Sequence, residues 1–130
     1  QTLVQPVLDR RCVECHKPGG EAAETDLESD KSYATLMAHG GERSLGTHVQ
    51  ARYDARRSLA GQCAAMASPL TELLSRDHYG VKLTPAEFER LIIWMDTYGQ
   101  RSGSHNPRQE EELRQLRTRL TPLLTLSGSE

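Results

Sequence analysis

Apolar residues recur at helical spacing in separate blocks of this chain, and Gly, Pro and helix-capping residues divide one block from the next. The clearest block begins with Thr84-Pro85-Ala86-Glu87, a capping box with proline at the first helical position. Residues at i, i+3, i+4 and i+7 then form one apolar face: Phe88, Leu91, Ile92 and Met95. With Gly99 as a C-terminal cap, this segment is predicted to be an amphipathic helix.

The same signals predict four further helices. They run from Leu3 to about Arg11, from Ser29 or Asp30 to about Ala38, from Pro69 to about Arg76, and from Asn106 to about Leu120. The last is highly charged, and it is expected to end at Pro122, with a disordered tail over residues 121–130. Its narrow leucine stripe suits a helix that lies on the domain surface or docks on a partner: Leu113, Leu116 and Leu120. The sequence shows no strand pattern and no internal repeat, so an all-α fold is expected.

A C-x-x-C-H run, Cys12-Val13-Glu14-Cys15-His16, follows the first predicted helix directly and is the strongest chemical signal. Thiols at i and i+3 lie about one helical turn apart, which suits addition to the two vinyl groups of one porphyrin. The histidine after the second thiol would then be the proximal ligand of the iron. We therefore expect one covalently bound haem c, held by Cys12, Cys15 and His16.

Other uses of a cysteine pair fit this chain less well. A zinc site needs a second ligand pair at matching spacing, and the third cysteine, Cys63, stands alone in the sequence. A redox C-x-x-C is expected inside a βαβ pattern, which the sequence lacks. Once the haem takes two thiols, Cys63 is left unpaired and is predicted to be a buried structural thiol.

Composition agrees with a small haem domain. The 130 residues are only 36% hydrophobic, with one Phe and one Trp, and a buried porphyrin would supply missing apolar volume. A net charge of −2 gives no electrostatic case for nucleic-acid binding, and no apolar run approaches membrane-spanning length. No signal peptide is present and the sequence begins at Gln1, so a processed protein or an excised domain is expected.

Between Gly40 and Gln62 the sequence shows no convincing periodicity, and we predict a long loop there. The loop either wraps the haem, with one or two arginines pairing with its propionates, or is a solvated surface segment. The arginines concerned are Arg43, Arg52, Arg56 and Arg57.

A helix that runs into C-x-x-C-H, with an L-T-P-x-E-F-x-x-L-x-x-W run over residues 83–94, resembles the class I cytochromes c. The resemblance implies a cytochrome c-like fold with about four core helices around one haem. This domain would span residues 1–104, and residues 105–130 would form a C-terminal charged helix and tail. In that family the distal iron ligand, most often methionine, lies in a loop shortly before the last core helix. Here His78 stands at the equivalent place.

Four short segments also resemble the haem-c domains of hydrazine-synthase-alpha-subunit-like proteins: residues 4–9, 67–70, 80–83 and 94–96. Those domains end large multidomain secreted proteins, and many carry a histidine just before G-V-K-L. The resemblance covers about residues 3–100. The catalytic haem of hydrazine synthase uses a tyrosine just downstream of its haem motif as an iron ligand, whereas Gly19, Gly20 and Glu21 occupy that neighbourhood here. The resemblance is therefore to an electron-relay haem.

Several side chains are chemically able to be the sixth iron ligand: His39, His48, His78, His105, Met37, Met66 and Met95. Met37 and Met95 sit on apolar helix faces and are better explained as core. His105 lies in a polar turn, and lone histidines beside a Gly-rich loop are usually exposed. Position favours His78. Met66 is the main alternative because it directly precedes a predicted helix, but it lies before the third helix, whereas the ligand loop of the family lies after it.

These observations predict a mono-haem electron-transfer domain, low-spin, with bis-histidine ligation and a low potential, acting as a carrier rather than an enzyme. Its partner would be a redox protein or other domains of a larger chain. A catalytic or gas-sensing haem with an open distal site is the alternative, and a structural haem module docked through the charged helix is a third. Because c-type haem is attached outside the cytoplasm, a periplasmic or otherwise exported location is expected.

Overall fold

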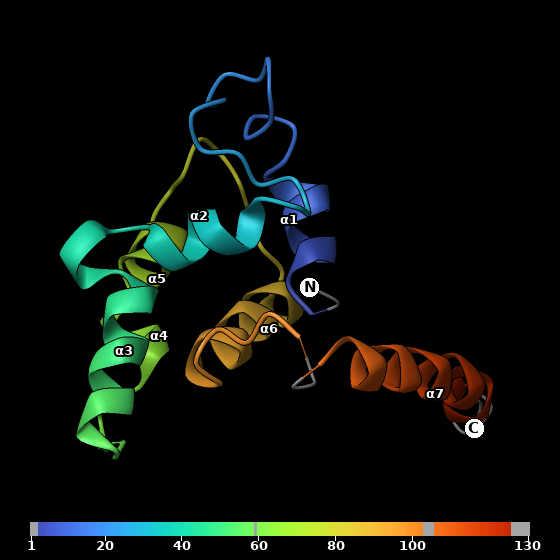
Figure 1. Cartoon of the computed structure of the whole chain (residues 1–130). Coiled ribbons are helices and arrows are strands. Elements are labelled where there is room, and N and C mark those ends of the chain that lie inside the picture. Colours follow the sequence, from blue (N-terminus) through green and yellow to red (C-terminus); the bar gives the residue numbers. More distant parts are fainter. Residues whose placement is uncertain (1–2, 59, 103–105, 126–130) are drawn as a thin grey trace. The chain divides into compact units, whose positions relative to one another are not determined.

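The computed structural model describes residues 3–58, 60–102 and 106–125 of the chain (Figure 1). In these ranges every regular element is a helix and no β-strand is formed, so the expectation of an all-α fold is confirmed. The chain divides into two compact units, Gln1–Gln100 and Arg101–Glu130, which we call unit 1 and unit 2. None of the helices in these ranges is both long and apolar enough to cross a membrane.

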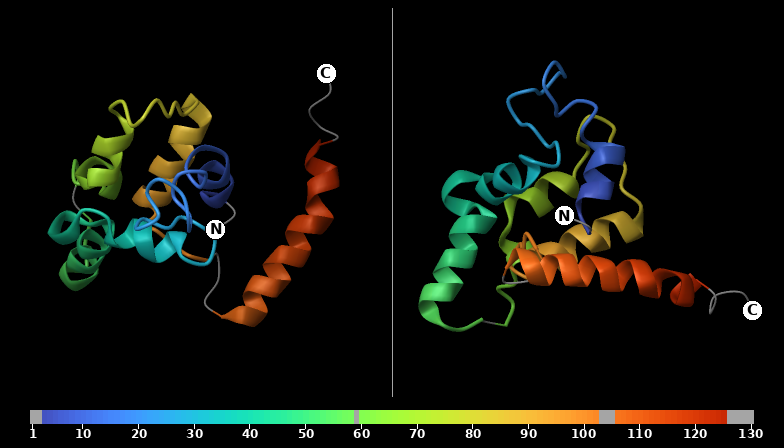
Figure 2. Two further views of the ribbon diagram at one scale, coloured as in Figure 1. Left: turned by 90° about the horizontal axis from the view of Figure 1, so that it is seen from above. Right: turned by 45° about the vertical axis from the view of Figure 1, so that its right-hand side comes forward.

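Unit 1 contains six α-helices and one 3₁₀ helix in its described part. In chain order they are α1 (Gln5–Arg11), α2 (Ser32–Ala38), η1 (Gly41–Arg43), α3 (Leu45–Ala55), α4 (Ala64–Ala67), α5 (Pro69–Leu74) and α6 (Pro85–Asp96). Their buried faces meet in one apolar cluster, to which α6 contributes Leu91, Trp94 and Met95. Further views show the same arrangement of unit 1, with α1 beside the start of α6 (Figure 2).

The capping signals of α6 are confirmed. The Thr84 hydroxyl accepts the Glu87 backbone N–H at 3.2 Å, and the Glu87 carboxylate accepts the Thr84 backbone N–H at 2.9 Å. At the other end the chain turns through Gly99, whose φ is +60°. A Cβ at Gly99 would lie 2.7 Å from the Met37 sulfur, so this position needs glycine for both its backbone conformation and its close packing.

The long loop predicted between Gly40 and Gln62 is wrong, because η1 and α3 occupy most of it. The Ser44 hydroxyl caps α3 by accepting the Thr47 backbone N–H at 3.2 Å. Leu45 is the one residue of α3 that is fully buried, so the helix carries no apolar stripe that the sequence could reveal. Gly46 lets α2 approach α3, since a Cβ there would lie 2.9 Å from the Met37 carbonyl oxygen. The short helix α4 was not predicted either.

Unit 2 contains α7 (Pro107–Thr125), which passes through Pro122, so the predicted end at that proline is wrong. A proline so close to the C-terminal end of a helix removes one backbone hydrogen bond and disturbs only the last turn. Threonine hydroxyls also satisfy helix carbonyls here: Thr118 donates to Arg114 at 3.1 Å and Thr121 donates to Arg117 at 2.8 Å. The predicted disordered tail is wrong over residues 121–125, and its remainder lies outside the described residues.

Candidate functional site

The C-x-x-C-H segment forms tight turns directly after α1. The Cys12 backbone N–H donates to the Leu8 carbonyl at 2.8 Å, and the His16 N–H donates to the Cys12 carbonyl at 3.0 Å. The chain then folds back, and a Cβ at Gly20 would lie 2.3 Å from the Cys15 carbonyl oxygen, so only glycine fits. Cys12 is half-buried and Cys15 is exposed. The turns therefore place both thiols and the His16 ring within one short segment.

The His16 imidazole is oriented by the loop that follows it. Its Nδ1 lies 3.1 Å from the Thr25 carbonyl oxygen, an acceptor that fixes the proton on Nδ1. The Leu27 backbone N–H donates to the His16 carbonyl at 2.9 Å, which closes the same loop from the other side. In this tautomer Nε2 keeps its lone pair, the state that a metal-binding histidine requires.

The His78 ring faces the His16 ring, although the two residues lie far apart in the sequence. The ring centres are 6.0 Å apart and the ring planes differ by 11°. Figure 1 shows the two segments that carry these rings at the same end of unit 1, in the upper part of the picture: one follows α1 and the other connects α5 to α6. Among the histidines that the structure describes, His78 alone contacts the His16 ring. Two imidazoles that bind one metal at about 2 Å have centres roughly 6 Å apart, so the spacing alone matches such a pair, while the nearly parallel planes are also those of two stacked rings.

A tight turn, His78-Tyr79-Gly80-Val81, holds His78 in this place. The Val81 N–H donates to the His78 carbonyl at 2.9 Å, and φ is +50° at Tyr79 and +76° at Gly80, as in a type I′ turn. The Asp77 carboxylate accepts the Gly80 N–H at 3.1 Å. Tyr79 is 94% exposed and meets the His78 ring edge-on at 5.1 Å between ring centres.

An open depression of about 490 Å³, with a mixed apolar and polar lining, lies along the chain directly after this turn. Val81 lines it and is also bridged to His78, so the depression adjoins the histidine turn. Its volume falls within the range of about 300–1,000 Å³ that is usual for ligand and cofactor sites. The residues that line it are Leu74, Ser75, Val81, Lys82, Leu83, Pro85 and Phe88.

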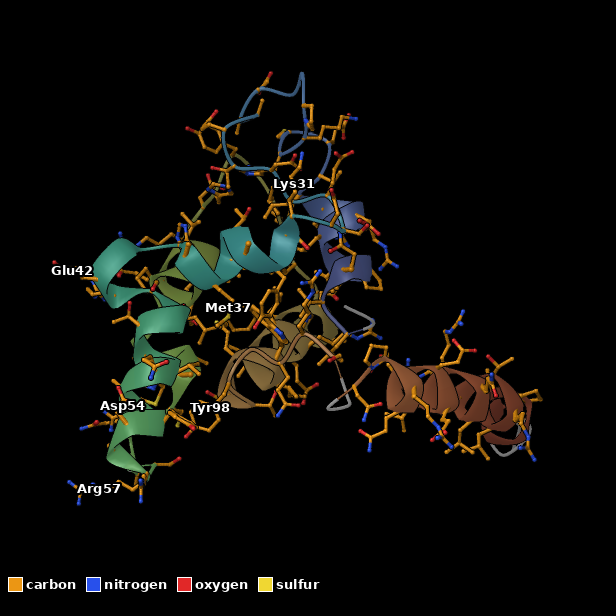
Figure 3. The ribbon with its side chains drawn as sticks, in the orientation of Figure 1. Lys31, Met37, Glu42, Asp54, Arg57 and Tyr98 are labelled. Carbon is orange, nitrogen blue, oxygen red and sulfur yellow. The ribbon has the colours of Figure 1, made fainter. Side chains whose placement is uncertain are left out.

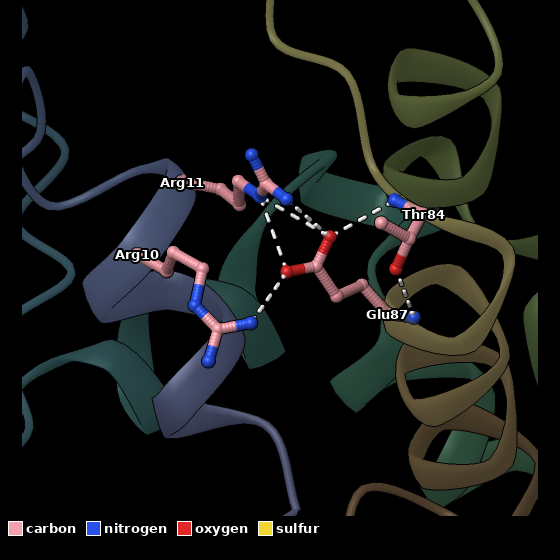
Figure 4. Close-up of polar contacts among 4 residues, drawn as sticks. All are labelled: Arg10, Arg11, Thr84 and Glu87. Atoms are coloured by element: carbon pink, nitrogen blue, oxygen red, sulfur yellow. Dashed lines mark hydrogen bonds and ion pairs between the residues drawn. The ribbon is translucent and has the colours of Figure 1, made fainter.

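Glu87 ties the start of α6 to the end of α1, immediately before the cysteine motif (Figure 4). Its side chain is 5% exposed and lies 3.0 Å from Arg10 Nη1 and 3.0 Å from Arg11 Nη2. The backbone N–H of Thr84 and the guanidinium of Arg11 lower the pKa of Glu87 to about 2. Next to this network, burial raises the pKa of the Cys12 thiol to about 11, so the thiol is neutral at pH 7.

The other candidate ligands lie elsewhere. Met66 is 72% exposed on α4, whereas Met95 is fully buried, with its sulfur 3.6 Å from the Thr71 hydroxyl. His39 and Met37 are half-buried at the end of α2, His48 is half-buried on α3, and His105 lies outside the described residues.

Two sequence predictions near the site need correction. Cys63 is exposed at the N-terminal end of α4, so the prediction of a buried structural thiol is wrong, because the chain before α4 runs over the surface. The arginines predicted in a loop lie instead on or beside η1 and α3. Arg43 pairs with Glu72, Arg52 donates to Gln62, and Arg57 points away from unit 1 (Figure 3).

Sequence reasoning missed the two features that hold the motif. Glu87 was recognised as part of a capping box, but its ion pairs with Arg10 and Arg11 join residues more than 70 positions apart and have no sequence signature. The Thr25 acceptor is a backbone carbonyl, which every residue possesses.

Within the described ranges no three His, Cys, Asp or Glu side chains converge as a metal site, so Cys12, Cys15 and His16 do not converge by themselves. Comparisons with protein families, with curated proteins and with solved structures return no match for this chain.

Proposed function

We propose that unit 1 is a c-type cytochrome domain that carries electrons through one covalently bound haem. The observation that carries the proposal is the pairing of the His16 and His78 rings at 6.0 Å, beside a C-x-x-C-H motif whose histidine is oriented by the Thr25 carbonyl. The proposed cytochrome c-like fold agrees with the all-helical structure and with the contact between α1 and the start of α6.

In this proposal Cys12 and Cys15 would attach the porphyrin as thioethers, and His16 and His78 would bind its iron. The depression after His78 offers apolar side chains that would exclude water from the porphyrin, among them Leu74, Leu83 and Phe88. The bound haem supplies one-electron exchange between Fe(III) and Fe(II). Two imidazole ligands favour a lower potential than a His/Met pair, because a thioether raises the potential.

The remaining parts of the proposal follow from this chemistry. A redox protein or other domains of a longer chain would exchange electrons with the haem, and attachment of haem c requires an exported, for example periplasmic, location. The exposed Tyr79, in edge contact with His78, lies where a redox partner could approach this end of unit 1.

The first test is the mass of the protein after expression with haem-maturation machinery. The denatured protein should exceed the polypeptide by the mass of one haem, and Cys63→Ser should not change this result because Cys63 is exposed on another part of unit 1. A mass equal to that of the bare polypeptide would contradict the proposal.

The second test is His78→Ala, compared with Met66→Ala as a matched control. The wild type should be low-spin in both oxidation states, with no charge-transfer band of an iron–methionine bond. His78→Ala should give high-spin iron and rapid CO binding in the reduced form. Met66→Ala should leave the visible spectrum unchanged, because Met66 is 72% exposed on α4 and the ring that lies next to His16 is that of His78. High-spin wild type would instead favour a catalytic or gas-sensing haem.

A further inference from the structure

Three leucines of α7 form an exposed apolar stripe. Leu113, Leu116 and Leu120 are 38%, 47% and 42% exposed. Their spacing of three and then four residues matches positions a, d and a of a heptad repeat, so they lie along one side of the helix. A stripe of this width is the seam of a two-helix coiled coil rather than the broader face of a helix that covers a globular core.

The charges beside this stripe change sign halfway along the helix. With Leu113 at position a, the flanking e and g positions are Glu110 and Glu112 in the first half of the helix. In the second half the corresponding positions are Arg117 and Arg119. Glu112, Arg117 and Arg119 are exposed, and Glu112 also pairs with Arg108 within the helix at 2.9 Å. The stripe is therefore bordered by acid at one end and by base at the other.

This pattern is complementary to itself when two such helices run in opposite directions. In an antiparallel pair, e faces e and g faces g, so Glu110 meets Arg117 of the second copy and Glu112 meets Arg119 of the second copy. Both pairs occur twice by symmetry, and Leu113 then packs against Leu116 of the second copy. In a parallel pair Glu112 alone would meet an arginine, Arg117 of the second copy, and Arg119 would have no acidic partner.

We propose that α7 is a self-association element, through which two copies of the chain pair in an antiparallel two-helix coiled coil. The partner of α7 is a second copy of this chain, because each of the four charged flanking positions then faces a residue of opposite charge on the antiparallel helix. A single helix of 19 residues with three leucines is smaller than the roughly 20–30 residues that each partner contributes to a standard interface. The dimer is therefore weak, with a Kd of about 10–100 μM.

Sedimentation equilibrium of the full chain tests the proposal, in reducing buffer so that the exposed Cys63 forms no disulfide. The wild type should show a monomer–dimer equilibrium in this concentration range. Glu112→Arg places arginine opposite Arg119 of the second copy at two symmetric sites and should weaken the dimer by about tenfold. Glu111→Arg is the matched control, since it makes the same charge change on the side away from the stripe and should leave the dimer unchanged.

The double variant Glu112→Arg with Arg119→Glu separates the two helix directions. Exchanging the two g positions restores attraction in an antiparallel pair, so the dimer should return to wild-type strength. In a parallel pair the new arginine faces Arg117 of the second copy, and the dimer should stay weak. Circular dichroism of each variant checks that α7 remains helical.

Three results would overturn the proposal. The first is a wild type that stays monomeric up to about 1 mM. The second is a dimer that Glu112→Arg and Leu116→Ala leave unchanged, which would place the contact elsewhere. The third is a double variant that does not recover, which would mean that the helices do not pair in the antiparallel direction.

Discussion

Helices α6 and α7 begin alike and end in opposite environments. Each starts with proline directly after a capping residue, Thr84 for α6 and Asn106 for α7, whose side chain accepts a backbone N–H three residues on. Each carries apolar residues at three- and four-residue spacing. In α6 Leu91 and Met95 are buried in the core of unit 1, and Phe88 and Ile92 are half-buried. The leucines of α7 are instead 38–47% exposed.

The difference shows that local signals define a helix but not what its apolar face contacts. A capping side chain and a helical period act within one or two turns, so they operate equally in both segments. Burial depends on segments far away in the sequence. The α6 face is covered because α4 packs against it and because Glu87 ties it to α1.

The largest expected effect is the loss of a buried side chain from α6. Met95 is fully buried, and Met95→Ala should lower the free energy of unfolding by about 2–5 kcal/mol because it leaves a cavity. Urea unfolding of the full chain, followed by circular dichroism, measures the change. A loss below about 0.5 kcal/mol would mean that α6 is no more firmly packed than an exposed helix.

The next effect concerns the buried carboxylate of α6. Because the folded pKa of Glu87 is lowered to about 2, its ion pairs stabilise the fold fully above the unfolded pKa of 4.5, and this stabilisation is lost as pH falls towards 2. Glu87→Gln should lower the Tm at pH 7 by about 5–10 °C and remove this part of the acid dependence. Thermal unfolding between pH 2 and pH 7 measures both.

Glu111 of α7 provides the matched control for Glu87. Its pKa is also lowered, by a hydrogen bond from Arg114, but its side chain is 44% exposed, so water screens the pair. Glu111→Gln should therefore leave the Tm and its acid dependence nearly unchanged. If the two substitutions lowered the Tm equally, the ion pairs of Glu87 on α6 would stabilise the protein no more than the exposed pair of Glu111 on α7.

The smallest expected effect is the removal of a leucine from α7. Leu116→Ala should change the free energy of unfolding of the monomer by less than about 0.5 kcal/mol, because the side chain is 47% exposed. Urea unfolding at a dilute, monomeric concentration measures it. A loss comparable to that of Met95→Ala would show that α7 is packed as tightly as α6, and would end the contrast between the two helices.

Sequence reasoning succeeded where the signal is local and failed where it is not. The Thr84 capping box and the helices around Val7, Leu36 and Leu91 were predicted from residues within two turns of one another. Helix α3 was missed because a single residue, Leu45, is fully buried there and leaves no period to detect. Pro122 was expected to end α7, but a proline near a helix end costs too little to stop it.

By itself the sequence determined the all-helical class and singled out the C-x-x-C-H run as the candidate site, because motif spacing and helix caps are short-range features. It also suggested His78 from its place before α6. Only the tertiary structure decided which groups meet: the His78 ring beside the His16 ring, the Thr25 carbonyl on Nδ1, and Glu87 between Arg10 and Arg11. These contacts join segments separated by up to 77 residues, and they depend on how the helices pack rather than on any local pattern.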